Sequence, residues 1–418
     1  MASPVKPPAP RATEEARLAF GRAAAELDAV LADLEAWVNL DTPSDDAAAL
    51  DAFAEVLAGT LEGYGMSPEL VRAGDGGRYL HAVLEGSGRA RVALLCHHDT
   101  VFPSGTAARR PFERERAPGR RVRGPGVADM KGGIAVAAHA ARILALGSRP
   151  FGRLELVSAP DEELRMAGPP ATLDRLRDFD AVLCMECGRE DHSVVSARKA
   201  GYWFRLRAVG RQEHAGVNPD GGRNAVMALC REALRVGALH RAHEDLTLVV
   251  TEFRGGENLN TVPGRAFLTG DLRARTAADV GWALERIRGF GEHDGVEIRA
   301  EEVVYTPPME RTPAAAALAS ASIALGRSLG HDFGEATTGG ASDGSFASEI
   351  DIPTLDGLGP AGGMDHTEHE YAEVSTFAPR IGVVAGLVAA VETGLLADLD
   401  RSDAATPTLD ERSRLPKG

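Results

Sequence analysis

Apolar positions follow two different periodicities along the chain, and the two alternate. Helical spacing marks four segments: 14–36, 46–63, 129–147 and 314–330. Short uninterrupted apolar runs, which are typical of buried strands, mark three others: 91–96, 153–158 and 181–185. Strands and helices that alternate in this way indicate a mostly parallel sheet with helices on both faces. The pattern therefore predicts an α/β fold.

The pattern changes near Ala197. Period-two alternation at 202–210 is followed by a helical segment at 225–239 and by two strand-like runs, at 246–256 and 265–276. Two strand pairs with helices between them are typical of a small α+β domain. Because segments rich in metal-ligand residues lie on both sides of this region, we expect it to be an insertion.

The chain is 418 residues long, which exceeds one ordinary hydrophobic core and favours two domains. We predict a catalytic domain made of 14–196 and 306–396 and an inserted domain at 197–305. The proline-rich start, 1–13, is predicted to be a disordered arm, and the polar end, 397–418, a flexible tail.

Composition excludes several classes of protein. A net charge of −15 disfavours nucleic acid and anionic membranes as partners, because the long-range field repels both. We find no run of about 18 apolar residues and no secretory signal, so we expect a cytoplasmic protein without a membrane helix. Four cysteines are too few for a disulfide scaffold, and the lone pair Cys184 and Cys187 lacks the second pair of a zinc motif.

Residues that bind metal ions gather where the predicted strands end. Five segments carry them: LLCHHDTVF, GPGVADMKGG, SAPDEEL, VLCMEC and GGMDHTEHEY. Carboxylates and imidazoles that converge from separate strand ends suit zinc or a similar divalent ion. The sequence therefore predicts a metallohydrolase.

The first of these segments offers a metal ligand and a group to orient it. Side chains alternate across a strand, so His97 and Asp99 share one face while His98 lies on the other. An aspartate two residues after a ligating histidine fixes its tautomer. A single histidine at a strand end is usually an ordinary surface residue, and either His97 or His98 could be the ligand.

The other segments are each ambiguous alone. Asp129 could simply begin a helix, and the acidic run 161–163 could be solvated surface. Glu186 is more informative, because a carboxylate that ends a buried strand is costly unless it is paired. His366 follows a glycine-rich loop, with His369 as an alternative. Together, the segments favour a metal site over separate surface features.

The chain resembles the M20 clan of dinuclear zinc peptidases, nearest to the glutamate carboxypeptidase branch. The similarity covers about 30–395 and rests on specific motifs: HHDTVFPSGTAARRPF, GPGVADMKGG, DEE, MEC, RGRQEHAGVNPDGGRNA, GGASDGSF and HTEHEY. It implies a catalytic α/β domain with an inserted lid or dimerisation domain, and two Zn²⁺ ions per chain, with Co²⁺ or Mn²⁺ as alternatives. The implied metal ligands are His97, Asp129, Glu163, Glu186 and His366.

The resemblance also implies the remaining roles. Glu162 would be the general base, and Asp99 would orient His97. His214, in QEHAG, would stabilise the oxyanion and reach the site of a neighbouring subunit, so a homodimer through the lid is expected. Asn260 and Arg273 resemble substrate-contacting positions, although each would ordinarily be a surface residue.

Two departures from the family pattern leave the released amino acid open. The motif HHD carries a second histidine where an apolar residue is more usual. The segment VVYTPPMERTP lacks a basic residue that is expected in glutamate-releasing members, and only Arg311 is nearby.

The predicted reaction is metal-dependent hydrolysis of an amide, which releases a C-terminal amino acid from a small peptide or N-acyl amino acid. An N-acyl-amino-acid deacylase or dipeptidase is the alternative. A non-catalytic scaffold is disfavoured, because the base and all the ligands are present.

Overall fold

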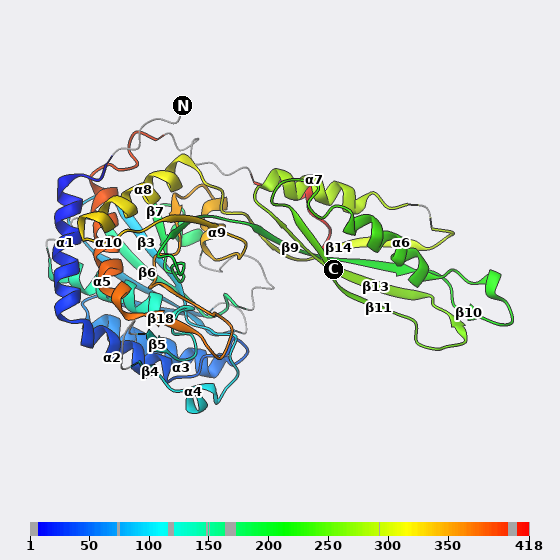
Figure 1. Cartoon of the computed structure of the whole chain (residues 1–418), viewed down its shortest axis with the longest axis horizontal. Coiled ribbons are helices and arrows are strands. Elements are labelled where there is room, and N and C mark those ends of the chain that lie inside the picture. Colours follow the sequence, from blue (N-terminus) through cyan, green and yellow to red (C-terminus); the bar gives the residue numbers. More distant parts are fainter. Residues whose placement is uncertain are drawn as a thin grey trace.

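The computed structural model describes residues 7–72, 76–115, 121–147, 149, 151–163, 173–291, 293–399 and 408–417. The chain forms two lobes that lie side by side (Figure 1). The larger lobe contains elements from both ends of the sequence, and the smaller lobe is built mainly from its middle.

A six-stranded mixed sheet forms the centre of the larger lobe. In spatial order its strands are β1 (Ser67–Arg72), β2 (Arg78–Glu85), β6 (Arg153–Ala159), β3 (Arg91–His97), β7 (Ala181–Cys184) and β16 (Thr354–Leu355). β3 pairs in parallel with both β6 and β7, and β7 pairs in parallel with β16. β2 pairs antiparallel with β1 and β6. The α/β fold and its three apolar strands are confirmed.

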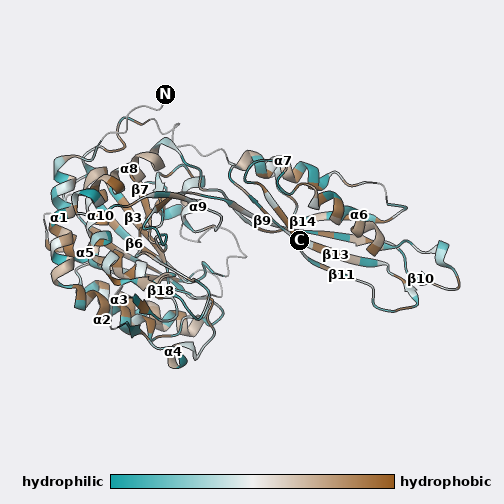
Figure 2. Cartoon of the chain, viewed as in Figure 1, coloured by the Kyte–Doolittle hydropathy of each residue, from teal (hydrophilic) through white to brown (hydrophobic). Residues whose placement is uncertain are grey.

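Helices cover both faces of this sheet. The helices of the larger lobe are α1 (Pro10–Ala25), α2 (Leu27–Val38), α3 (Ala47–Gly63), α4 (Thr106–Arg109), α5 (Lys131–Leu146), η1 (Leu173–Leu176), α8 (Pro313–Ser328), α9 (Gly344–Glu349) and α10 (Val374–Glu392). Of these, α3, α5, α8 and α9 contact the sheet directly. Figure 2 shows apolar residues concentrated between the helices and the sheet.

Helix α10 is the most deeply buried of these elements. It is long and apolar enough to cross a membrane by length and composition alone, and 94% of its most apolar window is buried inside the structure. The sequence shows no uninterrupted apolar run here, because Ser375, Thr376, Pro379 and Arg380 interrupt the apolar residues of the helix. It packs against α1, α5 and α8 as a core helix.

The predicted disordered arm is wrong for its last four residues. Helix α1 begins at Pro10, and proline suits the first turn of a helix because its missing N–H would be unpaired there anyway. Ala12, Ala16, Ala19 and Ala23 are buried, and α1 packs along α10. Small alanine side chains let the two helices approach closely. Residues 1–6 lie outside the described part of the chain.

The smaller lobe, called the lid domain below, contains a four-stranded antiparallel sheet. Its spatial order is β11 (Thr247–Gly255), β13 (Arg265–Ala274), β9 (Ala200–Val209) and β14 (Glu297–Thr306). Two helices cover one face, α6 (Ala225–Gly237) and α7 (Ala277–Arg288). Tyr202, Phe204 and Leu206 of β9 are buried in its core, whereas Trp203 points the other way and is partly exposed.

Small elements complete the two lobes. β8 (Val194–Arg198) pairs with β15 (Glu335–Thr338), and β17 (Gly362–Gly363), β18 (Tyr371–Glu373), β5 (Arg121–Arg123) and β4 (Glu113–Arg114) form a further sheet. In the lid, β10 (Glu213–His214) pairs with β12 (Thr261–Val262), followed by η2 (Pro219–Gly221). Figure 1 shows β10 at the end of the lid that is remote from the larger lobe.

The predicted flexible tail is wrong for 408–417, which pack on the lid domain and include η3 (Glu411–Ser413). Leu409 and Leu415 are buried in the lid core. Arg414 makes a two-pronged ion pair with Glu302, through Nη2 to Oε1 at 2.8 Å and Nε to Oε2 at 3.0 Å. The Glu302 backbone N–H donates to the carbonyl of Pro416, next to a bulge in β14. The segment is polar overall, so its composition predicts a flexible tail, but its two leucines are buried against the lid domain.

Replacing Arg414 with Met should destabilise the lid domain, because it leaves the buried Glu302 carboxylate without its cation. We expect a loss of about 2 kcal/mol in the free energy of unfolding, measured by urea denaturation followed through tryptophan fluorescence. Trp203 and Trp282 both lie in the lid. The control is Arg299→Met, since Arg299 pairs with Glu297 at the exposed surface. Equal losses in both variants would contradict the role given to Arg414.

Candidate metal centre

The predicted ligands meet at the carboxyl ends of the parallel strands. His97 is the last residue of β3, Glu163 follows β6, and Glu186 follows β7. Asp129 comes from the turn before α5, and His366 from the loop between β17 and β18. Neighbouring parallel strands end at the same edge of a sheet, which brings residues far apart in sequence together there.

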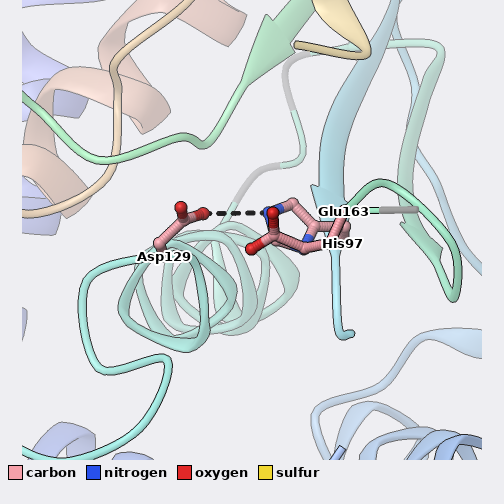
Figure 3. A group of neighbouring side chains, drawn as sticks. All are labelled: His97, Asp129 and Glu163. Carbon is pink, nitrogen blue, oxygen red and sulfur yellow. Dashed lines mark hydrogen bonds and ion pairs between the residues drawn. The ribbon is translucent and has the colours of Figure 1, made fainter. Parts of the chain in front are cut away.

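Asp129 lies between two histidines and faces each with a different oxygen. Its Oδ1 is 3.0 Å from His97 Nε2, and its Oδ2 is 3.3 Å from His366 Nε2. His97 Nε2 is 3.7 Å from Glu186 Oε1, and His366 Nε2 is 3.2 Å from Glu163 Oε2. Figure 3 shows Asp129, His97 and Glu163 pointing toward one another. The donor atoms thus form two groups, one around His97 and one around His366, and both groups include the Asp129 carboxylate.

The donor set fits divalent cations. Ligand atoms of His97, Asp129 and Glu163 all lie within 4.8 Å of one another. Burial raises the pKa of both Glu163 and Glu186, and the nearby charge of Asp129 raises both further. Carboxylates crowded in this way need positive charge to stay ionised. Nitrogen and oxygen donors of this kind suit zinc, cobalt or manganese.

The partners of the two buried histidines favour His97 over His98 as the candidate ligand, because His97 faces Asp129. His98 is fully buried, its Nδ1 lies 2.9 Å from Ser158 Oγ, and its ring stacks on Phe53. Burial lowers the pKa of His98 to about 4, so the ring is a neutral core residue. His369, the alternative to His366, is exposed and lies 3.7 Å from Glu368. Neither alternative reaches Asp129.

Asp99 connects the first ligand to the acidic run. Its Oδ1 lies 3.3 Å from His97 Nδ1, and its two oxygens accept the backbone N–H groups of Glu162 at 3.1 Å and Glu163 at 3.0 Å. Burial opposes ionisation of Asp99, but the hydrogen bond with His97 holds its pKa below the usual range. One buried carboxylate therefore positions both a histidine ligand and the loop that carries the predicted base.

A pocket of about 270 Å³ opens beside the donors. Glu162 lines it together with Asp129, Glu163, Glu186 and His366. A larger cavity, of about 870 Å³, lies at the amino ends of β3 and β7 around Phe179 and Pro353. None of the predicted site residues lines it, so the smaller pocket is the candidate site.

Three predicted residues are not brought to the pocket in the described structure. His214 is exposed in β10, at the remote end of the lid, and the Asn260 carbonyl accepts the N–H of Ala215 beside it. Arg273 lies on β13 and pairs with Asp271 at 2.7 Å. Arg311 also lies outside, because it pairs with Glu335.

The sequence reasoning overlooked Glu370. This carboxylate is buried and accepts three backbone N–H groups, from Gly126 at 2.9 Å, Ala128 at 2.8 Å and Asp129 at 3.0 Å. It therefore holds the turn that presents Asp129 to both histidines. One sequence feature could have pointed to Glu370: it lies in HTEHEY, four residues after His366. An acid there that is not itself a metal ligand needs another partner.

A scan against protein families matches residues 93–390, more than half of the chain, to peptidase family M20/M25/M40. The chain belongs to this family. The match contains every predicted metal ligand and the predicted base, so the protein is a hydrolase of the metallopeptidase and amidohydrolase kind. The resemblance noted from the motifs is confirmed.

Curated relatives of this M20 protein support the same branch. It is 26% identical to carboxypeptidase G2 from a Pseudomonas species, over 88% of this chain and 91% of that protein. It is also 26% identical to succinyl-diaminopimelate desuccinylase from Delftia acidovorans, over 78% of this chain and 89% of the relative.

Solved structures share the fold of this M20 protein. A tripeptidase from Staphylococcus aureus superposes with a TM-score of 0.73 at 18% identity, covering 88% of this chain and 99% of that one. An M20 family metallo-carboxypeptidase from Sulfolobus solfataricus gives a TM-score of 0.65 at 17% identity, covering 87% and 99%. At these identities the likeness concerns the fold.

Replacing Glu370 with Gln should weaken metal binding, because an amide N–H₂ would face backbone N–H donors and disturb the turn that holds Asp129. We expect zinc affinity to fall about 10- to 100-fold, as it does when groups behind a ligand are lost. Competition with a chromophoric chelator measures the change. Glu368→Gln, an exposed substitution two residues earlier, is the control. Unchanged affinity in Glu370→Gln would contradict the prediction.

Proposed function

We propose that this M20 protein hydrolyses an amide bond and releases a C-terminal amino acid from a small peptide or an N-acyl amino acid. The observation that carries the proposal is the shared carboxylate: Asp129 faces His97 with one oxygen and His366 with the other, and Glu162 lines the pocket beside them. The similarity to carboxypeptidase G2 supports the reaction class.

The proposed metal complement is two zinc ions. One would be held by His97, Asp129 and Glu186, and the other by His366, Asp129 and Glu163. Divalent ions in such a centre supply Lewis-acid polarisation of the substrate carbonyl and make water more acidic. Glu162 takes the proton of the attacking water and then donates it to the leaving amine. Asp99 keeps the His97 ring in position throughout.

We further propose that the enzyme works as a homodimer that pairs through the lid domains. His214 and Asn260 lie together at the remote end of the lid, so they are far from the metal centre of their own chain. Val217 is 79% exposed, and Leu259 beside Asn260 is fully exposed. Apolar side chains of this kind favour contact with another surface. His214 of the partner subunit would then stabilise the oxyanion.

A deacylase or dipeptidase is the second candidate. The similarity to succinyl-diaminopimelate desuccinylase supports this alternative, because that relative is named for removal of an acyl group. Both candidates break an amide bond and differ only in which side of the substrate is recognised. A panel that varies the acyl group and the C-terminal residue independently separates them.

Replacing Glu162 with Gln should abolish hydrolysis while the metal stays bound, because the amide cannot take a proton from water. We expect the rate on N-acyl amino acids or dipeptides to fall by about 10³-fold or more, with zinc content unchanged by elemental analysis. Asp161→Asn, whose carboxylate accepts the Tyr79 hydroxyl, is the matched control and should keep most activity. Equal activity of wild type and Glu162→Gln would refute the proposed function.

Mixing two inactive variants should restore activity if His214 acts across a dimer. A heterodimer of His214→Ala and Glu162→Gln contains one site with both lesions and one intact site. Random subunit exchange should therefore recover about a quarter of wild-type activity, because half of the dimers are mixed and half of their sites are intact. The two variants assayed separately are the controls. No recovery after exchange, verified by mass spectrometry of differently tagged chains, would show that His214 does not act across subunits.

A further inference from the structure

The pocket beside the metal centre is lined by side chains of both charges. The carboxylates of Asp129, Glu162, Glu163, Glu186 and Asp365 line it. Its other lining residues include Arg189, Arg198, Thr338, Gly340 and Ala341. Among the lining residues that the structure describes, the two arginines are the only permanent cations.

Arg198 is already used by the protein. Its Nε lies 2.7 Å from Asp356 Oδ2, and its Nη1 donates to the carbonyl of Gly340 at 3.2 Å. Asp356 is fully buried and also accepts the Ser342 hydroxyl. The Arg198 charge is therefore balanced, and its main effect is to hold the loop at Gly340 that lines the pocket.

Arg189 has no such partner in the described part of the chain. Its Nη2 donates to the carbonyl of Cys187 at 3.3 Å, and its Nε is buried without a hydrogen-bond partner. It forms no ion pair within 4.0 Å with a described carboxylate, and Asp365, which lines the same pocket, interacts with its charge only at longer range. A buried donor on a cation costs free energy unless an acceptor arrives. The position of Arg189 at the pocket wall allows a ligand to provide one.

The substrate of the proposed function supplies that acceptor. A released C-terminal residue carries a free carboxylate, which the acidic side chains of the pocket would repel. The segment after the lid lacks a basic residue for it, and Arg311 there is paired with Glu335. We propose that the Arg189 guanidinium binds the substrate's C-terminal carboxylate in this pocket. This inference rests on the proposed function, and it names the residue of the same pocket that selects substrates with a free C-terminal carboxylate.

The test compares Arg189→Met with wild type, both loaded with zinc. Substrates are N-acetyl amino acids and dipeptides, each paired with its C-terminal carboxamide. For carboxylate substrates we expect KM to rise about 30- to 100-fold, the effect of losing a charge-assisted hydrogen bond, with a much smaller change in kcat. Carboxamides should be poor substrates of both enzymes and should not distinguish them. Arg189→Lys should restore part of the affinity, because it keeps the charge without the planar fork.

A binding measurement separates recognition from chemistry. Calorimetry on Glu162→Gln, with and without Arg189→Met, should show weaker binding of the same N-acetyl amino acid when Arg189 is replaced. The matched control is Arg327→Met, because Arg327 pairs with Asp332 at the exposed surface of α8. Thermal unfolding checks that each variant is folded, and if Arg189→Met is not, Arg189→Lys and Arg189→Gln carry the comparison.

Two failures can be told apart. If wild type cleaves none of the amides, the proposed function itself is wrong. If wild type cleaves them and Glu162→Gln does not, but Arg189→Met keeps the KM for carboxylate substrates, only the role of Arg189 is overturned. A KM that rises equally for carboxylates and carboxamides also overturns it, because the effect would then come from the shape of the pocket.

Discussion

The structure of the centre depends on one carboxylate that serves two histidines. Asp129 can use both oxygens only because the turn that carries it is fixed, and Glu370 fixes it by accepting the backbone N–H groups of Gly126, Ala128 and Asp129. The other acids around Asp129 are buried and close to its charge, which raises the pKa of Glu163 and Glu186. Such an arrangement is stable when cations compensate the negative charge. Charge compensation thus links the local fold to metal binding.

The sheet explains why these residues can meet at all. β3, β6 and β7 are parallel neighbours, so their carboxyl ends lie together and each contributes one ligand or the segment that leads to it. Asp99 then joins two of these ends, because it contacts His97 and accepts the N–H groups of Glu162 and Glu163. The predicted base and two candidate ligands therefore share one support, and a shift of either strand would move them together.

Much of the larger lobe could be predicted from the sequence, because apolar strands leave local signals, and the candidate ligands came from the family motifs at the ends of those strands. His97 ends one such strand, and Glu163 and Glu186 follow two others. The tertiary partners could not be predicted. Glu370 accepts backbone N–H groups, and these do not depend on residue type, so the sequence does not mark them as its partners. Leu409 and Leu415 lie in a polar segment whose composition predicts a flexible tail. The distance of His214 from the pocket depends on the shape of the lid, which periodicity does not encode.

The residues that line the pocket also bear on the orientation and size of a substrate. On the proposed function, a scissile amide would lie beside Glu162 and the candidate metal ligands, and the substrate carboxylate would lie at Arg189. The volume of the pocket is about 270 Å³, which is small for a ligand pocket and suits a single amino acid more than an extended peptide. Arg198 is held by Asp356 and Gly340, so the part of the pocket lining that it forms is fixed. Selection among released residues would therefore depend on how well each side chain fills the space between Glu162 and Arg189.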